Sequence, residues 1–424
     1  MKKLFSSIFF LVIYFSAIAQ CDNSKNPIVF MHGFLASGDT YAGQIRRFIE
    51  AGYCADKLFV FDWNSVSGKA TRIDSLLNVF INSILQKTGA SQVDLVGHSA
   101  GGGVGRGYIS DSLHALKVSR YIHLGSGRWN KDLSWFPNSR CLNIFSKSDL
   151  IAGSRAGIVE GANNIDLDNK DHYEVATSLE TFNYIFSFLN QGKKTPGIRT
   201  TVLGKSTVAG KAVYLGDNSP MKRSRVNFFE IFPETGWRKK ETPDISLLTD
   251  SSGHWGPLSV SSRKNYEIEL LPAGEKERKI SYYFPGFKND DQFIYLRGFP
   301  TGNMVASLLG NMPSREDQSV ITIYSAEKAI IDGRDSISIN GIPVSSALLT
   351  PAARTIISSF IFDDGDGKSS GEPLKSYKMT PFIGGVDISL PVSTQGVNTV
   401  YYNGSILHLP SIPSSQRIMI AVIK

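Results

Sequence analysis

The chain has 424 residues, of which 42% are hydrophobic and 20% are charged, and its formal net charge is +7. This length exceeds one ordinary hydrophobic core, so we expect two or three globular domains. The charge surplus is modest and spread along the chain, and no metal-ligand spacing or nucleic-acid-binding motif accompanies it. The sequence therefore argues against two classes of protein, zinc-binding proteins and nucleic-acid-binding proteins.

Residues 1–19 have the pattern of a secretory signal peptide. Two lysines precede an apolar stretch at residues 8–13, and Ala17 and Ala19 supply the small residues of a cleavage site. The stretch is too short to remain as a membrane span. We expect cleavage after Ala19 and a secreted or periplasmic protein.

The chain contains three cysteines, Cys21, Cys54 and Cys141. One disulfide would suit an oxidising compartment, but the sequence does not assign its pairing. Because Cys21 lies close to the predicted cleavage site, a lipid anchor on its sulfur is an alternative to a free N-terminus. Gln20 is an unfavourable residue before a lipid-modified cysteine, so we favour a free N-terminus over a lipid anchor at Cys21.

Residues 24–192 alternate between short apolar runs and helical patterns. Apolar residues at 73–85 recur at a spacing of three or four, and the same pattern returns at 175–189. The apolar runs predict buried parallel strands rather than half-exposed ones: these are residues 28–31, 58–61, 93–96, 120–124 and 141–145. Such alternation predicts an α/β domain with a doubly wound, mostly parallel sheet.

Beyond residue 197 the pattern changes to short alternating segments separated by Gly, Pro, Asn and Asp. Residues 198–300 predict an antiparallel β-sandwich, weakly similar to the transthyretin-like repeats of secreted hydrolases. Residues 301–424 predict either a second β domain or the continuation of one composite β domain. The many aromatic residues at 227–295 are expected mainly in the sandwich core, with an acyl channel or lipid contact as the alternative, for instance at Trp237.

The stretch VDLVGHSAGGG, residues 93–103, contains a serine between two glycines directly after an apolar run. A nucleophile on a sharp strand-to-helix turn needs small neighbours, here Gly97 and Gly101, so that its side chain projects from the sheet edge. We therefore predict that Ser99 is a nucleophile. The glycine-rich segment that follows is unusual for a helix, and close packing against the sheet would explain it.

A serine nucleophile needs a histidine base and a carboxylate that orients this base. Among seven histidines, His172 lies in a loop before the last helical pattern, where a doubly wound sheet brings it over the carboxyl ends of the strands. Asp149 lies just beyond the run at 141–145, at the same edge. The rival carboxylates Asp166, Asp168 and Asp171 are closer to His172 in sequence but less able to reach its far nitrogen.

The tetrahedral intermediate of acyl transfer also needs amide donors for its oxyanion. The first amide of the helix after Ser99 belongs to Ala100. In FMHGFLASG, Gly33 lets the chain turn inward after the first strand, which predicts that the amide of Phe34 is the second donor.

These motifs, FMHGF, LVGHSAGG, SKSDLI and DHYEVA, occur in order over residues 27–190. This part of the chain resembles the bacterial lipase and esterase branch of the α/β-hydrolase family, in particular its small secreted lipases. The resemblance implies a Ser99, Asp149 and His172 triad, an oxyanion hole from the Phe34 and Ala100 amides, no cofactor, and hydrolysis of carboxylic esters including acylglycerols. The β-rich tail is similar to that of a subset of secreted or extremophile lipases.

Two features of the sequence bear on the site and its surroundings. The segments between strands have no room for a large helical cap, so the site is open unless the C-terminal region covers it. FDDGDGKSSGE, residues 362–372, alternates acidic residues as a calcium loop does, but Leu374 or Lys375 stands where an EF-hand needs glutamate. An acidic turn between strands is therefore the favoured interpretation.

We therefore expect an exported serine ester hydrolase, most concretely a triacylglycerol lipase that can act at a lipid–water interface. One alternative is a polyester or polysaccharide-ester hydrolase with a β binding module, and another is an inactive binding protein with a hydrolase fold. The sequence leaves the oligomeric state, the chain-length preference and the lid undetermined.

Overall fold

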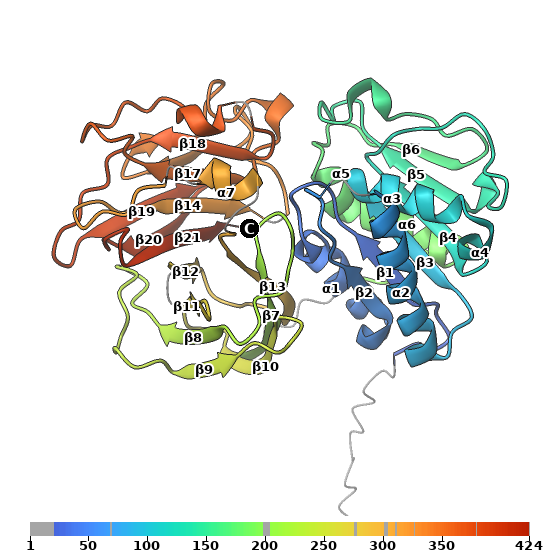
Figure 1. Ribbon diagram of the computed structural model, residues 1–424, viewed down its shortest axis with the longest axis horizontal. Helices are drawn as coiled ribbons and strands as arrows, with labels where there is room; N and C mark the ends of the chain where they lie inside the picture. The colour runs from blue at the N-terminus through green and yellow to red at the C-terminus, as the bar shows by residue number, and fades with distance from the viewer. Residues whose placement is uncertain are drawn as a thin grey trace, which may run out of the picture.

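The computed structural model describes residues 21–67, 70–197, 204–274, 278–300, 304–309, 312–325, 327–378 and 380–423 (Figure 1). The predicted signal peptide lies outside these residues. The described chain forms an N-terminal α/β domain and a C-terminal β region that lie side by side. No helix within the described ranges is both long and apolar enough to span a bilayer.

The N-terminal domain is built on one six-stranded, fully parallel sheet in the order β2-β1-β3-β4-β5-β6. The strands are β1 (Ile28–Met31), β2 (Leu58–Phe61), β3 (Val93–His98), β4 (Val118–Leu124), β5 (Cys141–Phe145) and β6 (Asn163–Asp166). The five strands predicted from apolar runs are present. The sixth strand, β6, lies at the edge of the sheet and has no apolar run, so neither residue periodicity nor hydrophobicity predicted it.

Helices cover both faces of this sheet, which confirms the predicted doubly wound fold. They are α1 (Ala42–Glu50), α2 (Ala70–Thr88), α3 (Ala100–Ile109), α4 (Ser112–Ala115), α5 (Glu174–Thr177) and α6 (Leu179–Leu189). On one face α1 and α6 contribute buried residues such as Phe48 and Phe182, and on the other α2 contributes Leu77 and Ile81. The last predicted helix is divided in two because Ser178 is extended and its hydroxyl caps the amide of Thr181 at 3.2 Å.

A disulfide joins Cys21 to Cys54 and fixes the start of the described chain to the loop after α1. The backbone amide of Asp22 also donates to the carbonyl of Gly52 at 2.8 Å. Cys141 is a free, buried thiol on β5.

The described part of the C-terminal region consists of three β-sheets, one short α-helix and two short 3-10 helices. Its elements are β7 (Lys205–Tyr214), β8 (Arg225–Glu230), β9 (Ile245–Leu248), β10 (His254–Ser261), β11 (Tyr266–Leu271), β12 (Lys279–Phe284), β13 (Asp291–Gly298), α7 (Met304–Leu309), β14 (Ile321–Ser325), β15 (Ile337–Ile339), β16 (Ile342–Pro343), β17 (Ser358–Phe362), β18 (Ile383–Asp387), β19 (Val397–Tyr402), β20 (Ser405–Pro410) and β21 (Arg417–Ile423). The central sheet has eight strands in the order β18-β17-β14-β21-β12-β11-β8-β9. A three-stranded sheet, β10-β7-β13, and a four-stranded sheet, β16-β15-β19-β20, contribute to the clusters on its two faces.

The two halves of the β region share this central sheet. Strand β21 pairs with β12 on one side and β14 on the other, so residues 204–300 do not close as a separate sandwich. Both of these pairs are parallel, as is β17 with β18. Within residues 198–300, β13 pairs with β7 in parallel, so the expectation of an antiparallel sandwich there is wrong for this pair. The cause is topological, because strands distant in sequence are inserted between neighbours, and local alternation carries no information about partners.

The β region is joined to the α/β domain by buried polar contacts. Arg297 pairs with Asp39 at 2.6 Å, and the hydroxyl of Tyr324 donates to the other oxygen of Asp39 at 2.9 Å. Lys211 pairs with Asp62 at 2.7 Å. These acidic residues follow β1 and β2, so the β region covers the carboxyl ends of the parallel strands.

The glycine-rich segment after Ser99 is helix α3, packed closely on the sheet. A Cβ atom at Gly101 would lie 2.3 Å from the carbonyl oxygen of Met31, and one at Gly105 would lie 2.7 Å from the ring of Tyr121. Gly103, in contrast, is exposed, and a Cβ there would meet nothing within 4 Å. Close approach to the sheet therefore explains Gly101 and Gly105 but not Gly103.

Alanine substitutions at Gly101 and Gly103 should have opposite effects on stability. Gly103→Ala should raise the free energy of unfolding by about 0.5–1 kcal/mol, because alanine restricts the unfolded chain and adds no clash. Gly101→Ala should lower it by about 1–3 kcal/mol through overpacking against the Met31 carbonyl. Denaturant unfolding of both variants checks this, and equal effects of the two substitutions would contradict the packing explanation.

Candidate active site

Ser99 lies on a sharp turn between β3 and α3. Its φ of 53° and ψ of −121° lie in a region that residues with a side chain rarely adopt. Two hydrogen bonds fix the turn. The amide of Ser99 donates to the Leu124 carbonyl at 2.9 Å, and the Ser126 hydroxyl donates to the Ser99 carbonyl at 2.7 Å. The flanking glycine Gly97 is required because a Cβ there would lie 2.5 Å from the Gly101 carbonyl oxygen. This is the geometry of a nucleophile elbow.

Asp149 and His172 form a buried pair at the same edge of the sheet. His172 Nδ1 lies 2.8 Å from Asp149 Oδ2, and the two side chains are 2% and 0% exposed. The second oxygen of Asp149 accepts from the amides of Ile151 and Ala152 at 3.0 and 2.9 Å. Because the carboxylate accepts at Oδ2, Nδ1 carries the proton in the neutral ring and Nε2 keeps its lone pair.

The environment of Asp149 favours its charged form. Burial by itself raises the pKa of this carboxyl, but the hydrogen bond and charge of His172 and the Ala152 amide outweigh burial. The pKa of Asp149 therefore lies below its ordinary value. A charged carboxylate at this position stabilises a protonated imidazole.

The three rival carboxylates either have other partners or face solvent. Asp166 pairs with Lys147 at 2.8 Å, and Asp168 is exposed. Asp171 accepts from the amides of Tyr173 and Glu174, at 2.7 and 2.9 Å, and pairs with Arg334 of the β region at 2.7 Å.

His172 is held next to the elbow through its main chain. Nε2 of His98 lies 2.7 Å from the carbonyl oxygen of His172, and the centroids of the two rings are 4.6 Å apart. Nε2 of His172 is buried and has no hydrogen-bond partner among the described residues, including the hydroxyl of Ser99. Hydrogen bonds of this kind are often long before substrate binds, so this nitrogen remains the candidate to accept the serine proton.

His98 is a residue of the site that the sequence analysis did not single out. Burial and the nearby charge of His172 lower its pKa to about 3, so its ring is neutral at neutral pH. The motif GHSAG itself was the available signal, because a side chain beside the nucleophile can reach the loop that carries the base. Its neutral ring positions the His172 loop without adding a second charge.

The predicted oxyanion-hole residues lie beside Ser99. A Cβ at Gly33 would be 3.2 Å from Cβ of Ser99, so the chain after β1 passes directly against the elbow. Among the described residues, the amides of Phe34 and Ala100 donate to no backbone or side-chain acceptor. Such free amides near a nucleophile are the donors that an oxyanion requires.

The β region also covers the histidine. The ring of Phe382 stacks on that of His172 with centroids 5.9 Å apart and planes 24° apart. Phe382 has a φ of 68°, a left-handed conformation that is strained for a bulky residue. The loop before β18 therefore holds an aromatic ring over the candidate base, and no sequence pattern indicated this residue.

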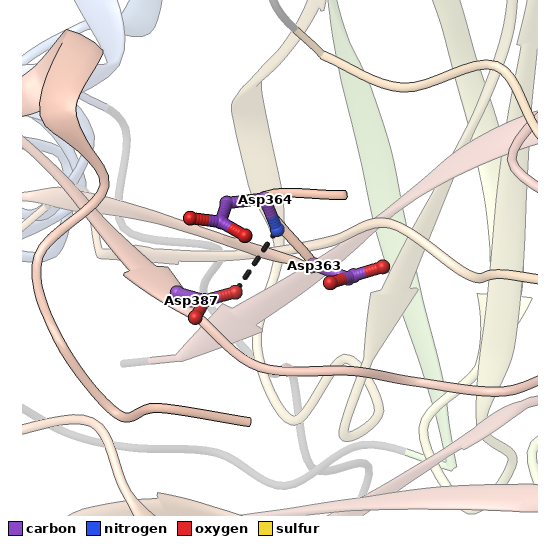
Figure 2. A group of neighbouring side chains, drawn as sticks. All are labelled: Asp363, Asp364 and Asp387. Atoms are coloured by element: carbon purple, nitrogen blue, oxygen red, sulfur yellow. Dashed lines mark hydrogen bonds between the residues drawn. The ribbon is translucent and has the colours of Figure 1, made fainter. Parts of the chain in front are cut away.

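The acidic segment at 362–372 forms a turn after β17, near the end of β18, where Asp387 lies (Figure 2). Asp363, Asp364 and Asp387 lie close together, and the oxygens of Asp363 and Asp387 already have partners. Asp363 accepts from the Gly367 amide at 3.0 Å and pairs with Arg315 at 3.1 Å, and Asp387 accepts from the Asp364 amide at 2.9 Å. The carboxylates thus organise the turn.

Trp237 packs in the β core rather than at a channel. Its side chain is half-buried against the cluster between the eight-stranded and four-stranded sheets, and its ring nitrogen donates to the Gly396 carbonyl at 3.2 Å. The core interpretation of this residue fits these contacts, whereas the acyl-channel alternative does not.

Comparison with protein families matches most of the chain in three parts. Residues 25–121 match the model of class 2 lipases, and residues 204–299 match that of the lipase C-terminal domain. Residues 309–419 match a further model described as a C-terminal domain. The chain is therefore a bacterial lipase- and esterase-like protein, and its class is that of the carboxylic-ester hydrolases.

Solved structures with similar folds cover the N-terminal domain. The Bacillus licheniformis lipase BlEst2 is 17% identical over 41% of this chain and 96% of its own, with a TM-score of 0.33. The carboxylesterase CesB of Bacillus subtilis is 13% identical over 41% and 87%, with a TM-score of 0.31. A CIB-like hydrolase of Thermoplasma acidophilum is 15% identical over 40% and 87%, with a TM-score of 0.32.

Proposed function

We propose that this protein is an exported serine hydrolase that cleaves carboxylic esters, most concretely acylglycerols, with Ser99, His172 and Asp149 as its catalytic triad. The observation that carries the proposal is the buried hydrogen bond of 2.8 Å between His172 and Asp149, next to a strained serine turn. A carboxylate–imidazole pair of this kind supplies the base that a serine hydroxyl needs.

The reaction then follows from the chemistry of these groups. Ser99 Oγ attacks the ester carbonyl while His172 Nε2 takes its proton, and Asp149 stabilises the imidazolium. The amides of Phe34 and Ala100 hold the oxyanion of the tetrahedral intermediate. His172 returns the proton to the departing alcohol oxygen, which leaves an acyl group on Ser99. Water, deprotonated by the same histidine, releases the acid and restores the serine.

Export is part of the proposal and has support from the disulfide. Disulfides persist in oxidising compartments, and Cys21 is paired with Cys54. A cysteine sulfur in a disulfide is not available for a thioether-linked lipid, so the disulfide favours a free chain over an anchored one.

A fluorophosphonate probe tests the proposed nucleophile and its base. The wild-type protein should become covalently labelled at Ser99, because an activated serine attacks phosphorus. Ser99→Ala should abolish both labelling and ester hydrolysis. His172→Ala should lower the rate of hydrolysis about 10³-fold or more, since the members of a triad act as a unit.

Asp171→Asn is the matched control, because it changes a neighbouring carboxylate that contacts no candidate catalytic atom. It should retain labelling, whereas Asp149→Asn should lose most of it. Full esterase activity in His172→Ala, or equal losses in the two aspartate variants, would contradict the triad. Absence of labelling in folded wild-type protein would favour an inactive binding protein.

The substrate class is tested by turnover on emulsified triglyceride, short soluble esters and polymer films. The proposal expects hydrolysis of triglyceride and soluble esters, measured by titration of the released acid. Hydrolysis confined to polymer films would favour the polyester or polysaccharide-ester alternative.

A further inference from the structure

An asparagine of the β region packs against the loop that carries the Phe34 amide. Asn218 lies on the turn after β7, has a φ of 56° and is 5% exposed. Its side-chain nitrogen donates to the carbonyl of Ala36 at 2.9 Å, and its side-chain oxygen accepts from the hydroxyl of Ser37 at 2.5 Å. Both partners closely follow Phe34 in the chain. Asn218 therefore joins the β region to the predicted oxyanion loop.

The same side chain reaches His32, which directly precedes Gly33. Nδ2 of Asn218 lies 3.2 Å from Nε2 of His32, and the backbone amide of Trp63 donates to this nitrogen, also at 3.2 Å. Because a backbone amide can only donate, Nε2 of the neutral ring is the acceptor and Nδ1 carries the proton. Burial lowers the pKa of His32, which favours the neutral ring.

The protonated nitrogen of His32 faces the carbonyl oxygen of Gly33 at 2.8 Å. This carbonyl belongs to the trans peptide unit whose N–H is the amide of Phe34. In a planar trans peptide the C=O and N–H bonds point in opposite directions, so a donor on the carbonyl also fixes the direction of the amide. The contacts from Asn218 through His32 to Gly33 thus end at one of the two predicted oxyanion donors.

We propose that Asn218 is a positioning residue for the oxyanion hole. It holds His32 in the tautomer that donates to the Gly33 carbonyl, and this bond directs the Phe34 amide at the oxyanion. The hydrogen bonds of the Asn218 side chain go to the oxyanion loop and to Trp63, so it acts through the loop and not on the substrate. The inference rests on the proposed function, and it makes the β region a part of the catalytic arrangement.

Asn218→Gly tests this role, because glycine adopts the same left-handed turn and removes the whole side chain. Values of kcat and KM are measured for a soluble ester, with kcat expressed per active site titrated to completion with a fluorophosphonate. A merely structural role lowers the number of titratable sites and leaves kcat per site unchanged. The positioning role lowers kcat per site about 3- to 30-fold, which is part of the effect of losing a whole oxyanion donor, and leaves KM within about 2-fold.

A trifluoromethyl ketone inhibitor gives a second measurement of the same effect. Ser99 Oγ bonds to its carbonyl carbon, the serine proton moves to His172, and the carbonyl oxygen becomes an oxyanion. The inhibition constant of Asn218→Gly should rise by the same factor as kcat/KM falls, because both quantities report stabilisation of an oxyanion.

Asn340→Gly is the matched control. Asn340 also has a left-handed φ, of 49°, and lies on the turn between β15 and β16. Its side chain bonds to Asn398 and to the amide of Thr399, within the four-stranded sheet of the β region. The kcat per site and the inhibition constant of this variant should equal those of the wild type.

The tautomer of His32 is measured in the wild-type protein, so the test stands even where Asn218→Gly does not fold. The ¹⁵N chemical shifts of the His32 ring at neutral pH should show a proton on Nδ1 and none on Nε2.

Three results would overturn the positioning role and leave the proposed function intact. They are an unchanged kcat per site in Asn218→Gly, an equal fall of kcat per site in Asn340→Gly, and a proton on Nε2 of His32 in the wild type. Absence of both ester hydrolysis and fluorophosphonate labelling in folded wild-type protein would overturn the proposed function and the positioning role together.

Discussion

The hydrogen bond from His172 to Asp149 is the interaction on which the proposed chemistry of this molecule depends. It forms only because two loops, after β5 and after β6, meet at the carboxyl edge of a parallel sheet. The buried carboxylate is satisfied by this imidazole and by two backbone amides. Removing the imidazole would leave a buried charge with less support, which typically costs several kcal/mol. The same bond fixes the tautomer that leaves Nε2 able to accept a proton.

The β region contacts the α/β domain at the edge of the sheet where the candidate active site lies. Its ion pairs with Asp39, Asp62 and Asp171 attach it to the ends of the parallel strands, and Phe382 covers the imidazole. Since the segments between strands are too short for a helical cap, the cover over the candidate base comes from the β region, through Phe382. Burial of the candidate base is therefore in part a property of the interface between the two parts of the chain.

The sequence predicted the parts of the molecule that local patterns determine. Apolar runs located β1 to β5, and the spacing of glycines around Ser99 predicted the elbow, because steric demands there act on adjacent residues. Chain order at one sheet edge was enough to select His172 and Asp149 as candidates that the structure brings together. Local patterns could not predict which strands pair in the β region, since β21 pairs with strands about 100 and 140 residues earlier along the chain. Phe382 could not be predicted for the same reason, because only tertiary packing brings it against His172.

The most direct test of the account is the crystal structure of the protein after reaction with a phosphonate. The account predicts phosphorus bonded to Ser99 Oγ, with the phosphonyl oxygen about 2.7–3.1 Å from the amides of Phe34 and Ala100. Nε2 of His172 should lie within hydrogen-bond distance of a phosphonate oxygen. Phosphorus on another residue, or an oxygen directed away from both amides, would contradict it.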